Sequence, residues 1–290
     1  MNLNIKEINV KSIITKSNIP GIDYVINPYV GCVHSCVYCY ARFMKKFTGH
    51  HNEHWGSFVD VKINAPDLIP ANSKKYVNKS IFISSVTDPY MCIERKYELT
   101  RKIIGKLIQL QPDLSILTKS SLVIRDIDLL KQFSNCDVGF TITTLDEILA
   151  HEIEPQASSP QARIEALKTL KYAGIKTYVF IAPIMPFVTD WRKIIEHTSQ
   201  YTDYYLFDKL NLKGEIWNSV GSWLASKHPD LLVKYREIYL KPNDYWLTEK
   251  SEIDAYCMQY NLNRQIFILP NKQKPFESKI KHYQNTLDCL

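Results

Sequence analysis

Six short apolar runs, each long enough for one buried β-strand, alternate along the chain with amphipathic stretches of helical length. Strands that alternate with helices usually pair in parallel, through right-handed crossovers. The pattern therefore predicts an α/β fold with a parallel sheet, and by itself it permits a doubly wound arrangement. The expected strands cover residues 24–30, 81–85, 114–118, 138–143, 176–181 and 204–209, and the expected helices cover residues 40–47, 97–110, 122–133, 161–173 and 191–201.

Two segments depart from this alternation. Residues 48–79 form a long polar insertion between the first expected helix and the second expected strand. From about Asn211 the chain becomes rich in Trp and Tyr, and we expect two helices followed by a short apolar strand at 265–269. We interpret this part as a cap packed on the main domain, which divides the chain into residues 1–215 and 216–290.

Composition limits the classes of protein that the chain can belong to. Of its 290 residues, 45% are hydrophobic and 23% are charged, which is typical of a globular domain. The first ten residues contain no apolar leader, and no stretch approaches 18 apolar residues, so we expect neither a signal peptide nor a membrane span. Seven cysteines, of which three are clustered, indicate a reducing cytoplasm rather than a disulfide framework.

The positive charge of the chain is concentrated in its first part. Residues 1–80 carry ten Lys and Arg against five Asp and Glu, whereas the formal net charge of the whole chain is only +6. Such an excess suits an anionic partner such as nucleic acid. Scattered, solvated lysines explain it equally well.

The three clustered cysteines, Cys32, Cys36 and Cys39, follow a C-x3-C-x2-C spacing. Three thiolates at this spacing can bind three irons of a [4Fe–4S] cluster and leave the fourth iron open to a small molecule. Zinc is the alternative, because His34 lies within the loop and a group of histidines at 50, 51 and 54 could provide a fourth ligand. The sequence favours the iron–sulfur site, with the zinc site left open.

The cysteine segment, residues 27–42, resembles the radical S-adenosylmethionine (SAM) superfamily, and within it the branch of spore photoproduct lyase and the DNA repair photolyase-like proteins. Five further motifs follow in that family's order and extend the resemblance over roughly residues 20–215. They lie at residues 84–90, 117–119, 141–147, 154–163 and 182–186.

This resemblance implies an open, incomplete (β/α)6 barrel of the TIM type with a C-terminal helical and aromatic cap. It also implies a [4Fe–4S] cluster, SAM, and reductive cleavage of SAM to a 5′-deoxyadenosyl radical. In such a barrel the site lies at the carboxyl ends of the strands, where the motifs fall. Tyr38 is then expected to line the adenine. Tyr40 either takes part in transferring a hydrogen atom or only packs the loop.

Polar residues that end the expected strands are candidates for binding SAM. Ser85, Thr87 and Asp88 can accept hydrogen bonds from the methionyl ammonium group, although an Asp-Pro turn with local capping is the plainer explanation. The resemblance assigns Lys119 to the carboxylate of SAM. It places Thr141 and Thr143 near the ribose, while the β-propensity of threonine is a sufficient alternative reason for both.

Arg163 and Glu154 lie on either side of a short polar loop. Arg163 can bind a carboxylate in a bidentate way near SAM, or it can form an ion pair with Glu154 that fixes the loop, which is the alternative we prefer. Ala182 is expected to offer its backbone to the adenine, since prolines stiffen its loop.

One feature departs from the resemblance. Spore photoproduct lyase has a cysteine in the motif of the second strand, where it returns a hydrogen atom to the product, and residues 82–88 contain none. Cys92 lies close by and could serve instead, although a buried structural cysteine is the preferred interpretation. Repair of spore photoproduct by the known route is therefore doubtful.

These observations predict a radical SAM enzyme, lyase-like, that acts on nucleic acid or a nucleotide. The alternatives are an enzyme that modifies a peptide or small metabolite, a zinc-stabilised nucleic-acid-binding protein, and a regulatory iron–sulfur protein that binds SAM without turnover. The expected partners are an electron donor of the flavodoxin or ferredoxin type and nucleic acid. The sequence leaves the substrate and the oligomeric state undetermined.

Overall fold

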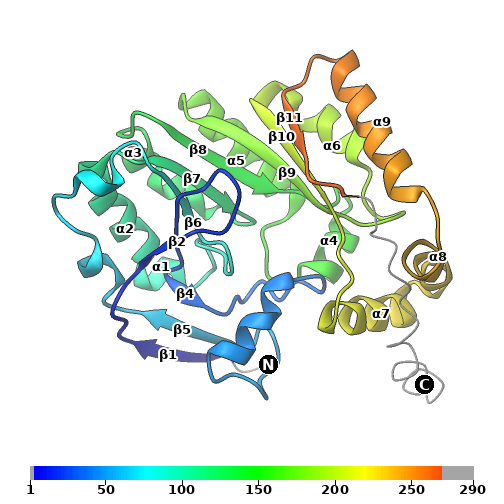
Figure 1. The fold of residues 1–290 in the computed structure, drawn as a ribbon, viewed down its shortest axis with the longest axis horizontal. Coiled ribbons are helices and arrows are strands. Elements are labelled where there is room, and N and C mark those ends of the chain that lie inside the picture. Colours follow the sequence, from blue (N-terminus) through cyan, green and yellow to red (C-terminus); the bar gives the residue numbers. More distant parts are fainter. Residues whose placement is uncertain (1–2, 270–290) are drawn as a thin grey trace.

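The computed structural model describes residues 3–269 of the chain. Its main feature is an eight-stranded sheet in the order β11-β10-β9-β8-β7-β6-β3-β2 (Figure 1). All neighbouring strands are parallel except β2 and β3. The strands span β2 Ile14–Lys16, β3 Tyr24–Ile26, β6 Ser80–Ile83, β7 Asp113–Thr118, β8 Cys136–Thr141, β9 Lys176–Ile184, β10 Tyr204–Lys209 and β11 Arg264–Ile266.

The strand order decides between the two expected architectures. From β3 to β11 each parallel strand joins the sheet on the same side as the one before it, whereas a doubly wound sheet reverses direction after its first strands. The sheet also has two free ends, β11 and β2, so the described strands do not close into a full barrel. The expected partial barrel is confirmed, and all six predicted barrel strands are present.

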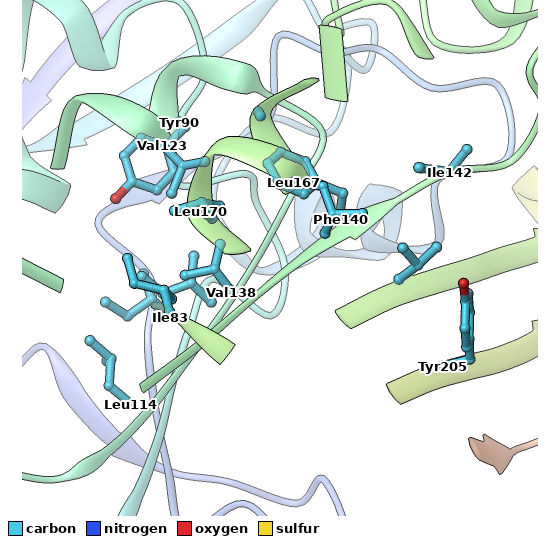
Figure 2. Packing of buried hydrophobic residues seen from close by; sticks show 14 of the residues in the cluster. Ile83, Tyr90, Leu114, Val123, Val138, Phe140, Ile142, Leu167, Leu170 and Tyr205 are labelled. Atoms are coloured by element: carbon cyan, nitrogen blue, oxygen red, sulfur yellow. The ribbon is translucent and has the colours of Figure 1, made fainter. Parts of the chain in front are cut away.

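Helices cover the outer face of this sheet. They are α2 Leu99–Leu107, α3 Ile127–Leu130, α5 Pro160–Tyr172, α6 Trp191–Thr198 and α9 Tyr245–Gln259, and all contribute to one buried core. Figure 2 shows part of this core, in which Leu167 of α5 lies beside Phe140 of β8. Buried residues alternate along the strands, as on β7, where Leu114 and Ile116 face the core. The residues between them face the interior of the barrel.

Aromatic rings fill that interior near the amino ends of the strands. Tyr178 of β9 stacks on Tyr204 of β10, with ring centroids 4.9 Å apart, and its hydroxyl donates to the carbonyl oxygen of Ile116 at 3.1 Å. Gly139 of β8 makes room for this ring, because a Cβ at that position would lie 2.2 Å from Tyr178. The plugged amino end leaves the carboxyl ends of the strands as the place for a site.

A second, small sheet lies beside the barrel. It has the order β1-β5-β4 and consists of Asn4–Ile8, Phe58–Lys62 and Tyr29–Val30. The expectation that residues 48–79 are simply a polar insertion is wrong, because β5 is buried and the 3₁₀ turn η2, Ala65–Leu68, begins with two buried residues. The charged Asp60 interrupts the apolar residues of β5, so the strand does not stand out in the hydrophobicity of the sequence. Its buried carboxylate is bound by Nε2 of His50 at 3.0 Å.

Three further elements differ from the expectation. The strand expected at 24–30 is divided at Asn27 and Pro28, since a proline cannot donate to a ladder, and its two parts join different sheets. Helix α4, Glu147–Ile153, was not expected. Its N-cap is Asp146, whose side chain accepts hydrogen bonds from the amides of Ile148 and Leu149. The 3₁₀ helix η1, Tyr40–Phe47, replaces the α-helix expected there.

The described C-terminal part contains three helices, α7 Glu215–Lys227, α8 Pro229–Leu240 and α9, where two were expected, and they are followed by β11. Its last strand does more than cap the barrel, because β11 pairs in parallel with β10 and extends the sheet. Residues 270–290, which complete the predicted cap, lie outside the described residues. Within residues 3–269, no helix is both long and apolar enough to cross a membrane.

The close contact at Gly139 gives a test of the barrel interior. In Gly139→Ala the new methyl group meets the Tyr178 ring, so we expect a loss of about 1–3 kcal/mol in the free energy of unfolding, measured by urea denaturation. Gly105→Ala is the matched control, because Gly105 lies in α2 with its nearest neighbouring atom 4.0 Å away. There we expect a gain of about 0.5–1 kcal/mol. Equal stabilities of the two variants would contradict the packing described.

Candidate active site

The cysteine loop runs from the end of β4 to the start of η1 and rests on the small sheet. Gly31 has φ +84°, and a Cβ there would lie 2.5 Å from the carbonyl oxygen of Phe58. Ser35 also has a positive φ, and its hydroxyl donates to the carbonyl oxygen of Trp55 at 3.0 Å. Gly56 packs directly against Ser35, with no room for a side chain. The residues around β5 therefore form the floor of the loop.

The three cysteines lie in a desolvated environment. Cys32 and Cys36 are buried, whereas Cys39 is half-buried. Burial raises the pKa of the Cys36 thiol to about 12, so without a bound metal this sulfur stays protonated at neutral pH. Nearby Lys119 and Arg163 act in the opposite direction and favour the thiolate. Such a site suits cysteines that become thiolates by binding a metal.

The donors near the cysteine loop can be compared with the needs of a single ion and of a cluster. Within residues 3–269, no three His, Cys, Asp or Glu side chains converge on a point where one metal ion could be held. A single zinc needs its thiolates about 2.3 Å from one point, while a four-iron cluster binds each thiolate at a different corner and therefore spreads them. Both ring nitrogens of His50 are also engaged, by Glu53 and Asp60. His50 is therefore not free to serve as the fourth ligand of a zinc site, and three cysteine thiolates are the ligand type that a [4Fe–4S] cluster uses.

Asp88 connects the cysteine loop to two strand ends. Its carboxylate accepts from the amide of Tyr90 at 2.9 Å, from the hydroxyl of Thr118 at 2.7 Å and from the amide of Lys119 at 2.8 Å. Nδ1 of His34, within the cysteine loop, lies 3.4 Å from the same carboxylate. Asp88 therefore holds these segments of the site together. Its hydrogen bond from the amide of Tyr90 is the local capping of the Asp-Pro turn that the sequence offered as an alternative.

Ser85 and Thr87, which follow β6, are held by other residues of the same region. The Ser85 hydroxyl accepts from the side-chain amide of Asn27 at 3.3 Å, and the Thr87 hydroxyl donates to the carbonyl oxygen of Gly31. Tyr40, the first residue of η1, donates its hydroxyl hydrogen bond to the carbonyl oxygen of Ser85. The structure thus places Ser85, Thr87 and Tyr40 together beside the cysteine loop.

A buried polar network closes the other side of the site. Glu154 forms an ion pair with Nη2 of Arg163 and accepts a hydrogen bond from the Tyr38 hydroxyl. The hydroxyl of Thr143 lies 3.2 Å from Glu154 and 3.3 Å from the carbonyl oxygen of Ala182. Both charged side chains are only 1% exposed. The network therefore joins the cysteine loop to the ends of β8 and β9.

Arg163 uses all its nitrogens inside this network. Besides the ion pair, its Nε donates to the carbonyl oxygen of Ser158 at 2.8 Å, and Nη1 donates to that of Thr141 at 2.9 Å. The half-buried Ala182 precedes a cis peptide bond to Pro183. These contacts are the ones expected if Arg163 pairs with Glu154 and fixes the loop between them. Thr141 takes part through its backbone carbonyl group.

Lys119 differs from the other charged residues at the site. Its Nζ lies 5.6 Å from the centroid of the Tyr38 ring. Burial by itself lowers the pKa of this ammonium group, but the negative charges of Glu154 and of Cys36 as a thiolate outweigh that effect and raise it. Among the ion pairs found between described residues, none includes Lys119. A half-buried cation in this position is available for an anionic ligand.

Cys92 does not match its preferred interpretation. It was expected to be a buried structural cysteine, but its side chain is exposed. Its neighbour Met91 is the residue that turns inward, and the Met91 sulfur lies 3.1 Å from the amide nitrogen of Val33 in the cysteine loop. The thioether of Met91 therefore faces the cysteine loop, whereas the thiol of Cys92 is exposed to solvent.

The model of the radical SAM superfamily matches residues 26–197, which is more than half of the chain. The chain belongs to this superfamily. The family predicted from the cysteine spacing and the later motifs is thus confirmed, and the chain is a radical SAM enzyme. The family's cofactors are a [4Fe–4S] cluster and SAM, as predicted.

Several relatives support this assignment. An uncharacterized protein of Methanocaldococcus jannaschii is 48% identical over 228 residues, which are 79% of this chain and 85% of the relative. An uncharacterized protein of Mycobacterium tuberculosis is 30% identical over 231 residues, 74% of this chain and 67% of the relative. A radical SAM Nα-GlyT isomerase of Pseudomonas phage M6 is 25% identical over 195 residues, 66% of this chain and 40% of that protein.

Solved structures share the fold of this radical SAM protein. Spore photoproduct lyase complexed with dinucleoside spore photoproduct superimposes with a TM-score of 0.68 at 16% identity. The match covers 90% of this chain and 81% of the lyase. At this identity the similarity establishes the fold, which is the partial barrel described above.

Two residues that hold the radical SAM site together were not among the candidates. Asn27 binds the end of β6 through Ser85 and through the amide of Val86 at 3.1 Å. Arg42 returns from η1 to the cysteine loop, where its Nη2 lies 3.0 Å from the carbonyl oxygen of Cys36. Both residues stand within the cysteine segment, residues 27–42, which is the signal that could have pointed to them. The atoms that they bind depend on the fold and are not visible in the sequence.

The buried ion pair provides a test of how the site is held. Glu154→Gln leaves the Arg163 charge without its counter-ion, so we expect a loss of about 3–5 kcal/mol in the free energy of unfolding of the apoprotein. Urea denaturation followed by circular dichroism measures this change. The matched control is Glu165→Gln on the exposed face of α5, where we expect a change within about 0.5 kcal/mol. A similar small effect for both variants would show that the network does not stabilise the fold.

Proposed function

We propose that the chain cleaves SAM reductively at a [4Fe–4S] cluster bound by Cys32, Cys36 and Cys39, and uses the resulting radical on a nucleic acid or nucleotide. When bound, the cluster supplies one electron to SAM, which gives methionine and a 5′-deoxyadenosyl radical. The observation that carries this proposal is the half-buried Lys119, which acts electrostatically on Cys36 and Cys39, lies 5.6 Å from the centroid of the Tyr38 ring and takes part in no ion pair among the described residues.

The residues around the cysteine loop have separate roles in this proposal. Lys119 binds the carboxylate of SAM, and the hydroxyl groups of Ser85 and Thr87 face its methionyl part. Tyr38 presents its ring to the adenine, because the hydroxyl of that ring is fixed by Glu154. Thr143 and Ala182 lie on the adenosyl side, linked to each other by a hydrogen bond. Asp88 and Arg163 orient these groups and do not need to touch SAM.

Support for a nucleic-acid substrate comes from one of the similar proteins and from charge. The spore photoproduct lyase of the same fold is complexed with a dinucleoside, and the basic excess of residues 1–80 suits a phosphate backbone. The absence of cysteine from residues 82–88 argues against the lyase's own reaction. Tyr40, whose ring is exposed while its hydroxyl contacts Ser85, is the candidate on this chain for contacting the substrate.

The formation of 5′-deoxyadenosine tests the radical chemistry. Protein reconstituted anaerobically with iron and sulfide, then given dithionite and SAM, is expected to produce it, as measured by liquid chromatography. Cys36→Ala is expected to abolish the product, and Cys136→Ala, at the opposite end of the barrel, to leave it unchanged. A colourless protein that binds zinc and forms no product would refute the proposal and favour the non-catalytic alternative.

A second test concerns the binding of SAM. Removing one charge-assisted contact costs about 1.5–3 kcal/mol, so Lys119→Met is expected to weaken SAM binding about 10- to 150-fold. Equilibrium dialysis of the reconstituted protein measures the affinity, while its visible absorption reports that the cluster is retained. Lys176→Met, which removes an exposed lysine at the amino end of β9, is the control. Unchanged affinity in Lys119→Met would remove Lys119 from the site.

A further inference from the structure

The 3₁₀ helix η1 carries a basic and aromatic surface, the η1 surface, formed by the exposed Phe43, Lys46 and Phe47 and the half-buried Lys45. Phe47 is 76% exposed and Phe43 is 44% exposed, and the two rings pack edge to face with centroids 6.2 Å apart. The η1 sequence contains three basic residues and no acidic one. Large exposed rings beside positive charges mark a surface that contacts another molecule.

The charges of this surface are not neutralised by the rest of the described chain. Neither Lys45 nor Lys46 is part of any ion pair found between residues 3–269. The neighbouring acid is Glu53, whose carboxylate is bound by His50 and by the side chain of Asn4. The pKa of Glu53 is lowered mainly by His50, with a smaller contribution from Lys45. The η1 surface therefore remains available to an acidic partner.

The position of η1 relates this surface to the cysteines. The helix begins at Tyr40, directly after Cys39, which is the least buried of the three cysteines. Ala41 is buried in the same core cluster as Cys32, and Arg42 donates to the carbonyl oxygen of Cys36. An electron that enters through η1 therefore has a short path to the cluster.

The candidates for binding SAM lie on other elements, and Tyr40, the candidate for contacting the substrate, is the first residue of η1 but not part of the η1 surface. Lys119, Thr143 and Ala182 follow or end barrel strands, so a substrate reaches SAM at the carboxyl ends of the sheet. Figure 1 shows η1, drawn in blue near the N label, outside the row of barrel strands and toward the end of the molecule where β1 lies. A surface that is close to the cysteines but outside the barrel is suited to a donor of electrons rather than to the substrate.

We propose that the η1 surface docks an acidic electron-carrier protein. This inference rests on the proposed function only in its need for a one-electron donor. Carriers that form small, short-lived complexes bury little area and depend on complementary charge, which matches a surface of two lysines and two rings. For a carrier with reduced flavin, the anionic hydroquinone loses one electron and becomes the neutral semiquinone, and the cluster gains that electron. No proton or further reactant is required.

The test compares the η1 surface with an equal charge change elsewhere. Reconstituted holoenzyme is mixed anaerobically with flavodoxin hydroquinone, and the appearance of semiquinone absorbance is followed by stopped flow. Lys45→Glu with Lys46→Glu is expected to slow this oxidation at least 10-fold at low salt. The control, Lys106→Glu with Lys131→Glu, reverses two exposed lysines on the outer helices and is expected to stay within twofold of the unchanged protein. Phe47→Ser is a second variant, expected to weaken cross-linking to flavodoxin without changing net charge.

Three results would overturn the proposal. The first is equal slowing by both double variants, which reflects net charge alone. The second is an unchanged rate in Lys45→Glu with Lys46→Glu and in Phe47→Ser. The third is weaker binding of single-stranded oligonucleotide by the η1 variants with an unchanged rate of flavodoxin oxidation, which assigns the surface to nucleic acid.

Dithionite separates this inference from the proposed function. Because dithionite is a small reductant, SAM cleavage driven by it is expected to be the same in the η1 variants and in the unchanged protein. If the unchanged protein forms no 5′-deoxyadenosine with dithionite, the proposed function fails. Cross-linking to flavodoxin, compared between the unchanged protein and Phe47→Ser, can still be measured in that case even if no cluster is present, so the docking surface is judged independently.

Discussion

The ion pair between Glu154 and Arg163 is the interaction on which the site depends most. Two opposite charges are removed from water almost completely, a state that is tolerated only when the remaining hydrogen-bonding positions are filled. Here they are filled by Tyr38 of the cysteine loop and by backbone carbonyl groups at the end of β8 and in the loop before α5. The requirement to satisfy two buried charges thereby fixes the distance between the cysteine loop and the barrel.

Asp88 performs the same task on the opposite side, but with a single charge. Its carboxylate gathers backbone and hydroxyl donors from β6 and β7 and also contacts His34. The cysteine loop is thus held between two polar anchors, with the small sheet beneath it. Lys119 lies between these anchors and takes part in no ion pair within residues 3–269, which is why we propose that it binds a ligand.

Most of the fold could be predicted from the sequence, because six strands with buried residues at alternate positions leave few possible arrangements. Strand β5 could not, since Asp60 interrupts its apolar pattern and is compensated only by His50, a contact that exists after folding. The candidates of the site were recognised as types of residue at strand ends. The sequence could not show which of these residues hold the site together and which remain free to bind a ligand. That distinction depends on contacts between distant residues, such as Tyr38 and Glu154, which lie 116 positions apart.

The dependence of the cysteine loop on distant partners has a consequence for the order of assembly. Its floor is built from residues 55–61, and its lateral contacts come from β7, β8 and α5, which are synthesised much later. Contacts between such distant segments form late in folding. The loop can therefore reach its final shape only after most of the barrel exists, so iron and sulfide must be delivered to a nearly complete protein rather than to a nascent chain.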